Sequence, residues 1–245
     1  MKLLLSITIS LISFSSFAQN KGPTQIIGED TRVRVTDTNA KSVHNSMGLL
    51  LLKYSDGTSM CTGTVVGTRQ VITAAHCLYN IKTEESVQEV RFYPGLRDHY
   101  SKGKFPFGVF SAKFMRVNPA YKIAGDTQED YALLTFLENL PVAAQPLDVL
   151  NLKVASISIA GYPADKTLGE LWEGTGIRYA HKSNPFAENH SVDTIGGQSG
   201  SAVRYGNKIV GIHSGAITYG AEKSNVAFFF TEKTLETVKN WIKAD

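Results

Sequence analysis

Residues 193–201 read DTIGGQSGS, and this stretch decides how the whole chain is interpreted. Its serine, Ser199, follows Gly196-Gly197 and precedes Gly200. Because glycine adopts backbone conformations closed to other residues, we expect a tight turn that presents the Ser199 hydroxyl together with bare backbone N–H groups. A serine hydroxyl is a weak nucleophile and needs a base to take its proton. The stretch therefore predicts a base elsewhere in the chain.

Two further stretches supply the partners that Ser199 needs. Residues 73–77 read TAAHC and offer His76 as the base, while residues 130–134 read DYALL and offer Asp130 as the acid. The acid would hold the imidazole in the tautomer whose free nitrogen faces the serine. Asp126 is the nearby alternative, but Asp130 is the acid that heads the apolar run. The order His, Asp, Ser differs from that of subtilisin and of the α/β-hydrolases.

With these motifs in this order, the chain resembles the trypsin-fold serine endopeptidases, and most of all the bacterial glutamyl endopeptidases. Residues 25–38, QIIGEDTRVRVTDT, are similar to the mature amino terminus of the latter family. The resemblance implies an all-β fold of two six-stranded antiparallel Greek-key barrels with a short C-terminal helix. It also implies peptide-bond hydrolysis through an acyl-enzyme, with the N–H groups of Gly197 and Ser199 binding the oxyanion.

The apolar pattern alone also predicts an all-β chain that ends in a helix. Near the C-terminus the period changes, because Leu235, Val238, Trp241 and Ile242 fall on one helical face that Thr231 can cap. A proline-containing crossover at 138–150 suggests a first barrel within 25–140 and a second within 141–245. The expected strands are 48–54, 60–66, 69–73, 87–93, 108–115, 131–136, 154–161, 174–180, 201–205, 208–213 and 226–230.

The first residues have the features of an export signal. Lys2 precedes an apolar run over 3–14, and residues 16–18 read SFA, which suits cleavage after residue 18. The run is too short to favour a membrane span. We expect residues 19–24 to be a short pro-segment of a zymogen, with the mature chain starting at Gln19, Gln25 or Ile26. We therefore expect a secreted protein, extracellular or periplasmic, that leaves the membrane once the signal is removed.

Composition and cysteine content exclude several classes of function. The net charge of +3 becomes +1 when Lys2 and Lys21 are removed with the leader, so there is no electrostatic footprint for nucleic acid. Cys61 and Cys77 are the only cysteines, and in an oxidising compartment such a pair favours a disulfide over a metal site. The resemblance implies the same bridge beside the catalytic histidine. The sequence has no HExxH, repeated CxxC or phosphate-binding loop, so we expect no metal or cofactor. We also expect a monomer that acts on polypeptides.

Substrate preference depends on two further segments. Residues 211–215 read GIHSG, and the resemblance implies that His213 and Thr194 line the pocket and bind a substrate carboxylate. The alternative is Asp193, which matches the position where trypsin-like pockets hold an acid for arginine or lysine. We favour cleavage after Glu or Asp, because His213 would lie in the same pocket.

Two positions depart from the resembled families. Gln198 stands where trypsin-like enzymes carry the aspartate that pairs with a newly freed amino terminus, and Ala202 stands where glutamyl endopeptidases commonly carry a proline.

A non-catalytic trypsin-fold binding protein is an alternative function, but such proteins usually lack a triad member. An esterase of the α/β-hydrolase type would need Gly-x-Ser-x-Gly, and Ser201 occupies the last position of that motif.

Overall fold

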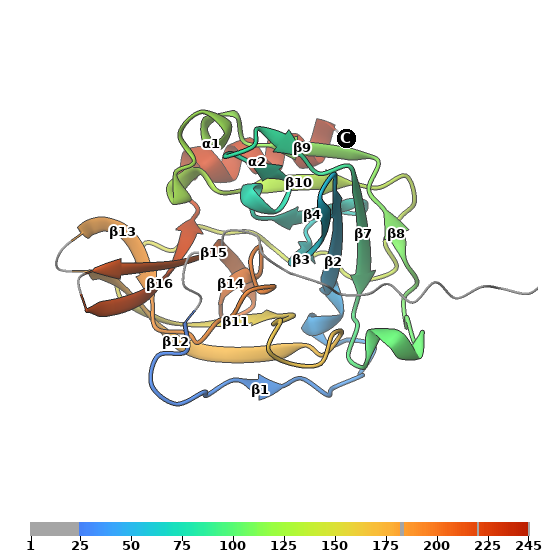
Figure 1. The fold of residues 1–245 in the computed structure, drawn as a ribbon, viewed down its shortest axis with the longest axis horizontal. Coiled ribbons are helices and arrows are strands. Elements are labelled where there is room, and N and C mark those ends of the chain that lie inside the picture. Colours follow the sequence, from blue (N-terminus) through green and yellow to red (C-terminus); the bar gives the residue numbers. More distant parts are fainter. Residues whose placement is uncertain (1–24, 182–183, 220, 245) are drawn as a thin grey trace, which may run out of the picture.

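The structure is a computed structural model that describes residues 25–181, 184–219 and 221–244, so the expected signal and pro-segment lie outside the described residues. The described chain folds into two seven-stranded antiparallel sheets, which lie side by side in Figure 1, and a small two-stranded sheet. The helix α2 (Glu232–Ala244) is the last described element. The expected all-β fold with a C-terminal helix is confirmed. Of the two expected six-stranded barrels, the C-terminal one closes, whereas the N-terminal seven-stranded sheet, within the described residues, has no strand pairing between its edge strands.

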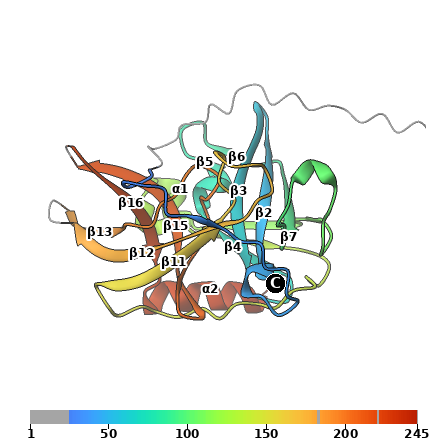
Figure 2. The same ribbon diagram turned by 90° about the horizontal axis from the view of Figure 1, so that it is seen from below.

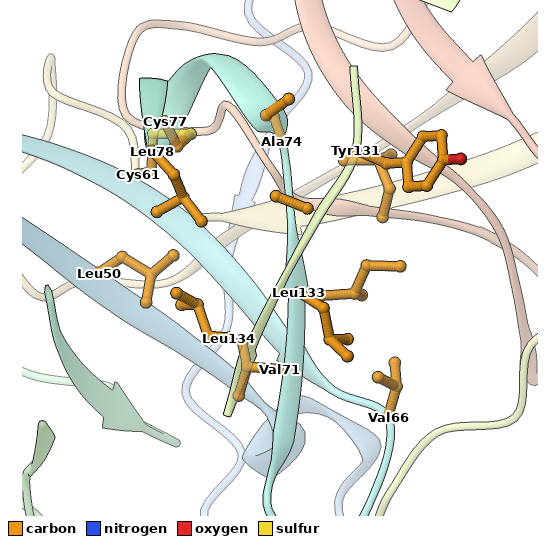
Figure 3. Packing of buried hydrophobic residues seen from close by; sticks show 14 of the residues in the cluster. Leu50, Cys61, Val66, Val71, Ala74, Cys77, Leu78, Tyr131, Leu133 and Leu134 are labelled. Atoms are coloured by element: carbon orange, nitrogen blue, oxygen red, sulfur yellow. A yellow bond between two sulfur atoms is a disulfide. The ribbon is translucent and has the colours of Figure 1, made fainter. Parts of the chain in front are cut away.

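The N-terminal sheet has the strand order β8-β7-β2-β3-β4-β10-β9. Its interior strand β2 is buried on both faces, since Leu49 and the next residue, Leu50, belong to different hydrophobic clusters. Figure 3 shows the cluster on the Leu50 side, with Val71, Leu133 and neighbouring side chains packed together. The strands are β2 (Met47–Tyr54), β3 (Gly57–Val65), β4 (Gln70–Thr73), β7 (Glu89–Pro94), β8 (Phe110–Ser111), β9 (Phe114–Val117) and β10 (Ala132–Thr135).

The C-terminal sheet contains a closed barrel of six strands, β11 to β16, because β12 pairs with both β11 and β13. The strand β1 (Val33–Arg34), near the start of the described chain, pairs antiparallel with the first two residues of β12 (Figure 1). The barrel strands are β11 (Ala155–Gly161), β12 (Trp172–His181), β13 (Asn184–His190), β14 (Ala202–Tyr205), β15 (Lys208–Tyr219) and β16 (Glu222–Phe229).

Short elements connect the strands. The two-stranded sheet follows the turn that holds His76, and α1 lies between β9 and β10. These elements are β5 (Tyr79–Asn80), β6 (Glu85–Ser86), α1 (Pro119–Ala124) and 3₁₀ turns at Val43–Ser46, Ala75–Cys77, Tyr100–Lys102 and Thr127–Glu129. Neither α-helix in the described part of the chain is long and apolar enough to cross a membrane.

Besides the two-residue strands β1, β5 and β6, which no expected range covers, the strands differ from the expected ones mainly in three places. The single strand expected over 108–115 is divided into β8 and β9, which lie at opposite edges of the N-terminal sheet. The connection still spans the gap, because the Ala112 N–H donates to Val90 on one edge and the Lys113 N–H to Thr135 on the other. The strand β13 was not expected at all. Finally, β15 continues beyond His213 to Tyr219 and pairs with β16 again from Gly215 after a register shift.

The C-terminal helix forms as its apolar period predicts. The Thr234 N–H donates to Thr231 Oγ1 at 3.2 Å, which confirms the expected cap. Leu235 and Val238 are buried in a cluster that includes residues of both sheets, and Figure 2 shows α2 lying along one side of the molecule. The Trp241 ring lies 5.5 Å from that of Tyr131, so the helix also supports the residue that follows Asp130.

Candidate active site

His76 and Asp130 come together because their strands are neighbours. The 3₁₀ turn with His76 follows β4, Asp130 precedes β10, and these two strands are paired antiparallel. His76 Nδ1 lies 2.7 Å from Asp130 Oδ2, and the His76 backbone N–H donates to Asp130 Oδ1 at 2.9 Å. One buried carboxylate thus fixes both the ring and the backbone of the histidine.

The electrostatics of this pair suit a general base. The side chain of His76 is 31% exposed, whereas that of Asp130 is 3% exposed. Burial by itself would lower the pKa of His76, but the charge of Asp130 and its hydrogen bond outweigh burial and raise that pKa above its ordinary value. A base whose pKa lies near the working pH transfers protons efficiently.

The turn that carries Ser199 lies against the same part of the N-terminal sheet. The Thr62 N–H donates to the Ser199 carbonyl at 2.8 Å. Gly200 has a φ of +82°, and a Cβ there would collide with Thr73 Oγ1, three residues before His76. The turn is therefore packed directly on the segment that leads to the histidine, and only glycine fits this close approach.

The backbone at Gly197 has the form that the sequence predicts. Its φ is +95°, and a Cβ would collide with the carbonyl oxygen of Tyr162. Among the described residues, the N–H groups of Gly197 and Ser199 have no hydrogen-bond acceptor. They are thus free to donate to a ligand.

Thr62, which sequence reasoning missed, joins the N-terminal sheet to the C-terminal barrel at this turn. Its Oγ1 donates to the Gly197 carbonyl at 2.9 Å and accepts from the Tyr162 N–H at 3.1 Å. Its carbonyl accepts from Thr73 Oγ1 at 2.8 Å. The neighbouring Cys61 forms the expected disulfide with Cys77, shown in yellow in Figure 3, which ties β3 to the His76 turn. A threonine within the expected strand 60–66 was the only sequence signal, and it is not specific.

The two expected pocket residues lie beside this turn. The His213 N–H donates to the Ser201 carbonyl and its carbonyl accepts from the Gly200 N–H, both at 2.8 Å, so β15 is held next to Ser199. Thr194 is fully buried, and its Oγ1 has no partner within the described residues. Both residues therefore lie on the backbone that flanks Ser199.

A second histidine, His190, completes this region and was not expected. It lies on β13, and its Nε2 is 3.1 Å from Nδ1 of His213. Burial lowers the pKa of His190 to about 3 and that of His213 well below its ordinary value, the latter with a contribution from the neighbouring histidines. Both rings are therefore neutral at physiological pH.

Asp193 does not present a free carboxylate. Its Oδ1 accepts from the Ile27 N–H at 2.8 Å, and its Oδ2 accepts from the N–H and the Oγ1 of Thr31 at 2.9 and 2.7 Å. The side chain is buried and satisfied by the N-terminal segment. A basic substrate side chain would have to compete with these three hydrogen bonds.

The N-terminal segment also reaches the pocket through Gln25. Its carbonyl accepts from the Thr194 N–H at 3.3 Å and from Asn225 Nδ2 at 3.0 Å. The amide oxygen and nitrogen of the Gln25 side chain are buried and have no partner within the described residues, as is also true of Asn225 Oδ1. Since buried polar groups are normally hydrogen-bonded, these atoms mark a region suited to a polar ligand.

Comparison with known proteins identifies the family. The family model for trypsin matches residues 36–242. The chain belongs to the trypsin family. A glutamyl endopeptidase from Bacillus licheniformis is 26% identical to this trypsin-family chain, over 88% of this chain and 68% of the relative. A protein of Bacillus subtilis strain 168 named extracellular metalloprotease is 26% identical, over 91% of this chain and 71% of its own.

Solved structures agree with this assignment. A structure described as Glu endopeptidase in complex with MPD matches with a TM-score of 0.77 at 27% identity, and the match covers 90% of this chain and all of that one. Together with the relatives, it makes this member of the trypsin family a serine endopeptidase. The sequence resemblance to glutamyl endopeptidases is confirmed.

The name of the Bacillus subtilis relative raises the question of a metal. In the described part of this trypsin-family chain, one group of potential ligand atoms lies close enough together, formed by Cys61, His76 and Cys77. The two sulfurs are joined in the disulfide, so neither offers the thiolate that a metal requires. These residues do not fit a metal site.

Proposed function

We propose that this serine endopeptidase is a secreted glutamyl endopeptidase that cleaves after Glu, and less readily after Asp, with His76, Asp130 and Ser199 as its catalytic triad. The observation that carries the proposal is the neutral, buried His213 beside the Ser199 turn, together with an Asp193 already satisfied by the N-terminal segment. Trypsin-like cleavage after Arg or Lys would need the Asp193 carboxylate to be free to bind a basic side chain.

The proposed chemistry builds on the observed His76–Asp130 pair and assigns Ser199 the role of nucleophile. His76 accepts the Ser199 proton through Nε2 while Asp130 holds Nδ1, and the Ser199 oxygen attacks the scissile carbonyl. The N–H groups of Gly197 and Ser199 donate to the oxyanion that develops. The imidazolium, stabilised by Asp130, then protonates the leaving amine. Water repeats the sequence on the acyl-enzyme, with His76 again as base.

Recognition of a carboxylate follows from the polar groups of the pocket. Burying a substrate carboxylate is costly unless hydrogen bonds or a positive charge meet it. When His190 donates through Nε2 to His213 Nδ1, His213 keeps its own proton on Nε2 and can donate it to the substrate. The unpartnered Thr194 hydroxyl supplies a second donor. Two neutral donors would then bind the carboxylate without an arginine.

Export and maturation belong to the same proposal. We assign residues 1–18 to a signal peptide, 19–24 to a pro-segment, and 25–140 and 141–245 to the two barrel-bearing halves of a monomer. The buried position of Gln25 at Thr194 supports a mature terminus at that residue. Amino-terminal sequencing of the active protein tests this assignment, which a terminus at Gln19 would contradict.

Two peptide series that differ only at P1 test the specificity. We expect the wild type to prefer Glu, and His213→Ala to lower kcat/KM for Glu peptides roughly 10²-fold, because loss of a partner of a buried charge costs about 2–5 kcal/mol. Cleavage after small neutral residues should change far less. His99→Ala, which removes an exposed histidine, is the control and should behave as wild type. A wild-type preference for Arg or Lys would overturn the glutamyl assignment, and no hydrolysis of any peptide would favour a binding protein.

A further inference from the structure

A buried arginine lies directly behind the turn that carries Ser199. The side chain of Arg32 is 0% exposed, although it belongs to the N-terminal segment just before β1. Its Nε and Nη2 donate to the two oxygens of Asp30, each at 2.9 Å. Its Nη2 and Nη1 donate to the two oxygens of Asp165 at 2.6 and 3.2 Å. The fifth N–H of the guanidinium remains for a neutral partner.

That partner is Gln198, the residue immediately before Ser199. Arg32 Nη1 donates to Gln198 Oε1 at 3.1 Å, and both side chains are buried at this contact. The same Oε1 accepts from the Ile195 N–H at 2.9 Å, while the Gln198 N–H donates to the Ile195 carbonyl at 3.0 Å. The Gln198 side chain thus closes the 195–198 turn, which contains Gly197, and Arg32 holds the oxygen that closes it.

Asp165 connects the arginine to the other side of the turn. It lies in the loop after β11, where the Ala164 N–H donates to the Gly196 carbonyl at 2.7 Å. Lys166 from this loop lies 3.0 Å from Asp30 Oδ2. Arg32 therefore joins the N-terminal segment, the 162–166 loop and the Ser199 turn in one connected group.

Arg32 stays positively charged at every pH at which the protein is folded. Burial alone would lower the pKa of Arg32, but the hydrogen bonds with Asp30 and Asp165 outweigh it and raise that pKa. The hydrogen bond with Arg32 in turn holds the pKa of Asp30 well below its ordinary value. A fully buried guanidinium with all five donors engaged has one geometry, so it can transmit position to Gln198.

We propose that Arg32 is a positioning residue for the oxyanion turn, acting through Gln198 Oε1 to fix the peptide units of Gly197 and Ser199. The inference rests on the proposed role of those N–H groups. The positive charge that holds position 198 belongs to a side chain and not to a newly freed amino terminus. The turn therefore does not depend on where the chain is cleaved upstream of Asp30. Cleavage before Gln25 then acts on the substrate pocket, which Gln25 contacts, and leaves the turn unchanged.

The test measures kcat and KM per active site, with sites counted by titration with a fluorophosphonate. Arg32→Lys keeps the charge but cannot make five hydrogen bonds, and Gln198→Leu removes the acceptor while Asp30 and Asp165 still hold Arg32. We expect each change to lower kcat roughly 10- to 10²-fold with KM within about threefold, since loss of one oxyanion donor costs roughly 10²- to 10³-fold. The double variant should be no slower than the slower single one.

The matched control is Arg34→Gln, in the same segment, whose 38% exposed side chain pairs with Glu170 at 3.2 Å; it should keep kcat within about twofold. If Arg32 served only stability, titratable sites would fall while kcat per site stayed at the wild-type value, which overturns the inference. Should Arg32→Lys fail to fold, Gln198→Leu decides by the same criterion. Ser199→Ala is assayed in parallel, because hydrolysis by that variant would refute the proposed triad, whereas an inert Ser199→Ala with normal Gln198→Leu refutes only the positioning role.

Discussion

The Thr62 hydroxyl forms two hydrogen bonds across the junction between the N-terminal sheet and the C-terminal barrel. Replacing Thr62 with valine keeps the shape of the side chain and its place on β3 but removes both hydrogen bonds of Oγ1. The Gly197 carbonyl and the Tyr162 N–H would then be buried without a partner. The same strand offers a matched control, because Thr64 is also fully buried and its Oγ1 has no partner within the described residues.

The size of the effect follows from these contacts. A buried polar group without a partner costs about 1–3 kcal/mol, so two such groups in Thr62→Val should cost about 2–6 kcal/mol of unfolding free energy. For a chain of this size about 1 kcal/mol shifts Tm by roughly 2–4 °C, which gives a decrease of roughly 4–24 °C. Thr64→Val deprives no buried polar group of a hydrogen-bond partner, so it should leave Tm unchanged or slightly higher.

Thermal unfolding followed by circular dichroism measures the difference. Both substitutions are made in a Ser199→Ala background, so that self-digestion does not distort the transition. In the active background Thr62→Val should also lower kcat, because the Gly197 peptide loses its anchor, while Thr64→Val should not. Melting temperatures of the two variants within about 2 °C of each other, equivalent to less than about 1 kcal/mol, would refute the reasoning.

Two further predictions follow from the His76 turn. Asp130→Asn removes the charge that raises the pKa of His76 and leaves burial, which lowers it, so the acid limb of the kcat/KM profile should move to lower pH while kcat falls about 10⁴-fold; an acid limb that stays in place would contradict this. Replacing Cys61 and Cys77 together with serine opens a loop of sequence separation 16 and should cost about 3 kcal/mol in guanidinium unfolding, and a variant as stable as wild type would show that the bridge contributes nothing.

Local patterns were enough to predict the parts of the fold that carry the catalytic candidates. The apolar run that became β2 is buried on both faces, as its lack of alternation indicated. The motifs at His76 and Asp130 each mark a strand end, and adjacent strand ends place them within hydrogen-bonding distance. These predictions succeeded because each needed only a few neighbouring residues and one pairing of strands.

The strand β13 could not be predicted in this way. Residues 184–190 read NPFAENH, which includes a proline and shows no regular apolar alternation. The segment is extended because β12 and β16 present edges on either side of it, and tertiary pairing overrides a weak local preference. His190 was missed with the strand, since only barrel closure brings it to His213.

The group around Arg32 was missed for a different reason. The replacement of aspartate by Gln198 was visible in the sequence, but the arginine that bonds it lies 166 residues away. Asp193 likewise could have faced the pocket or the N-terminal segment, and only the fold shows that it bonds Ile27 and Thr31. Partners at such separations follow from the docking of the N-terminal segment, which no local pattern specifies.

The most direct test of the proposed triad is the stoichiometry and site of covalent labelling by a fluorophosphonate, read by intact mass and peptide mapping. We predict one label per active molecule, on Ser199 alone, with loss of peptide hydrolysis in proportion to labelling and no label on Ser199→Ala. Labelling of another residue, or full hydrolysis by protein labelled at Ser199, would contradict the assignment.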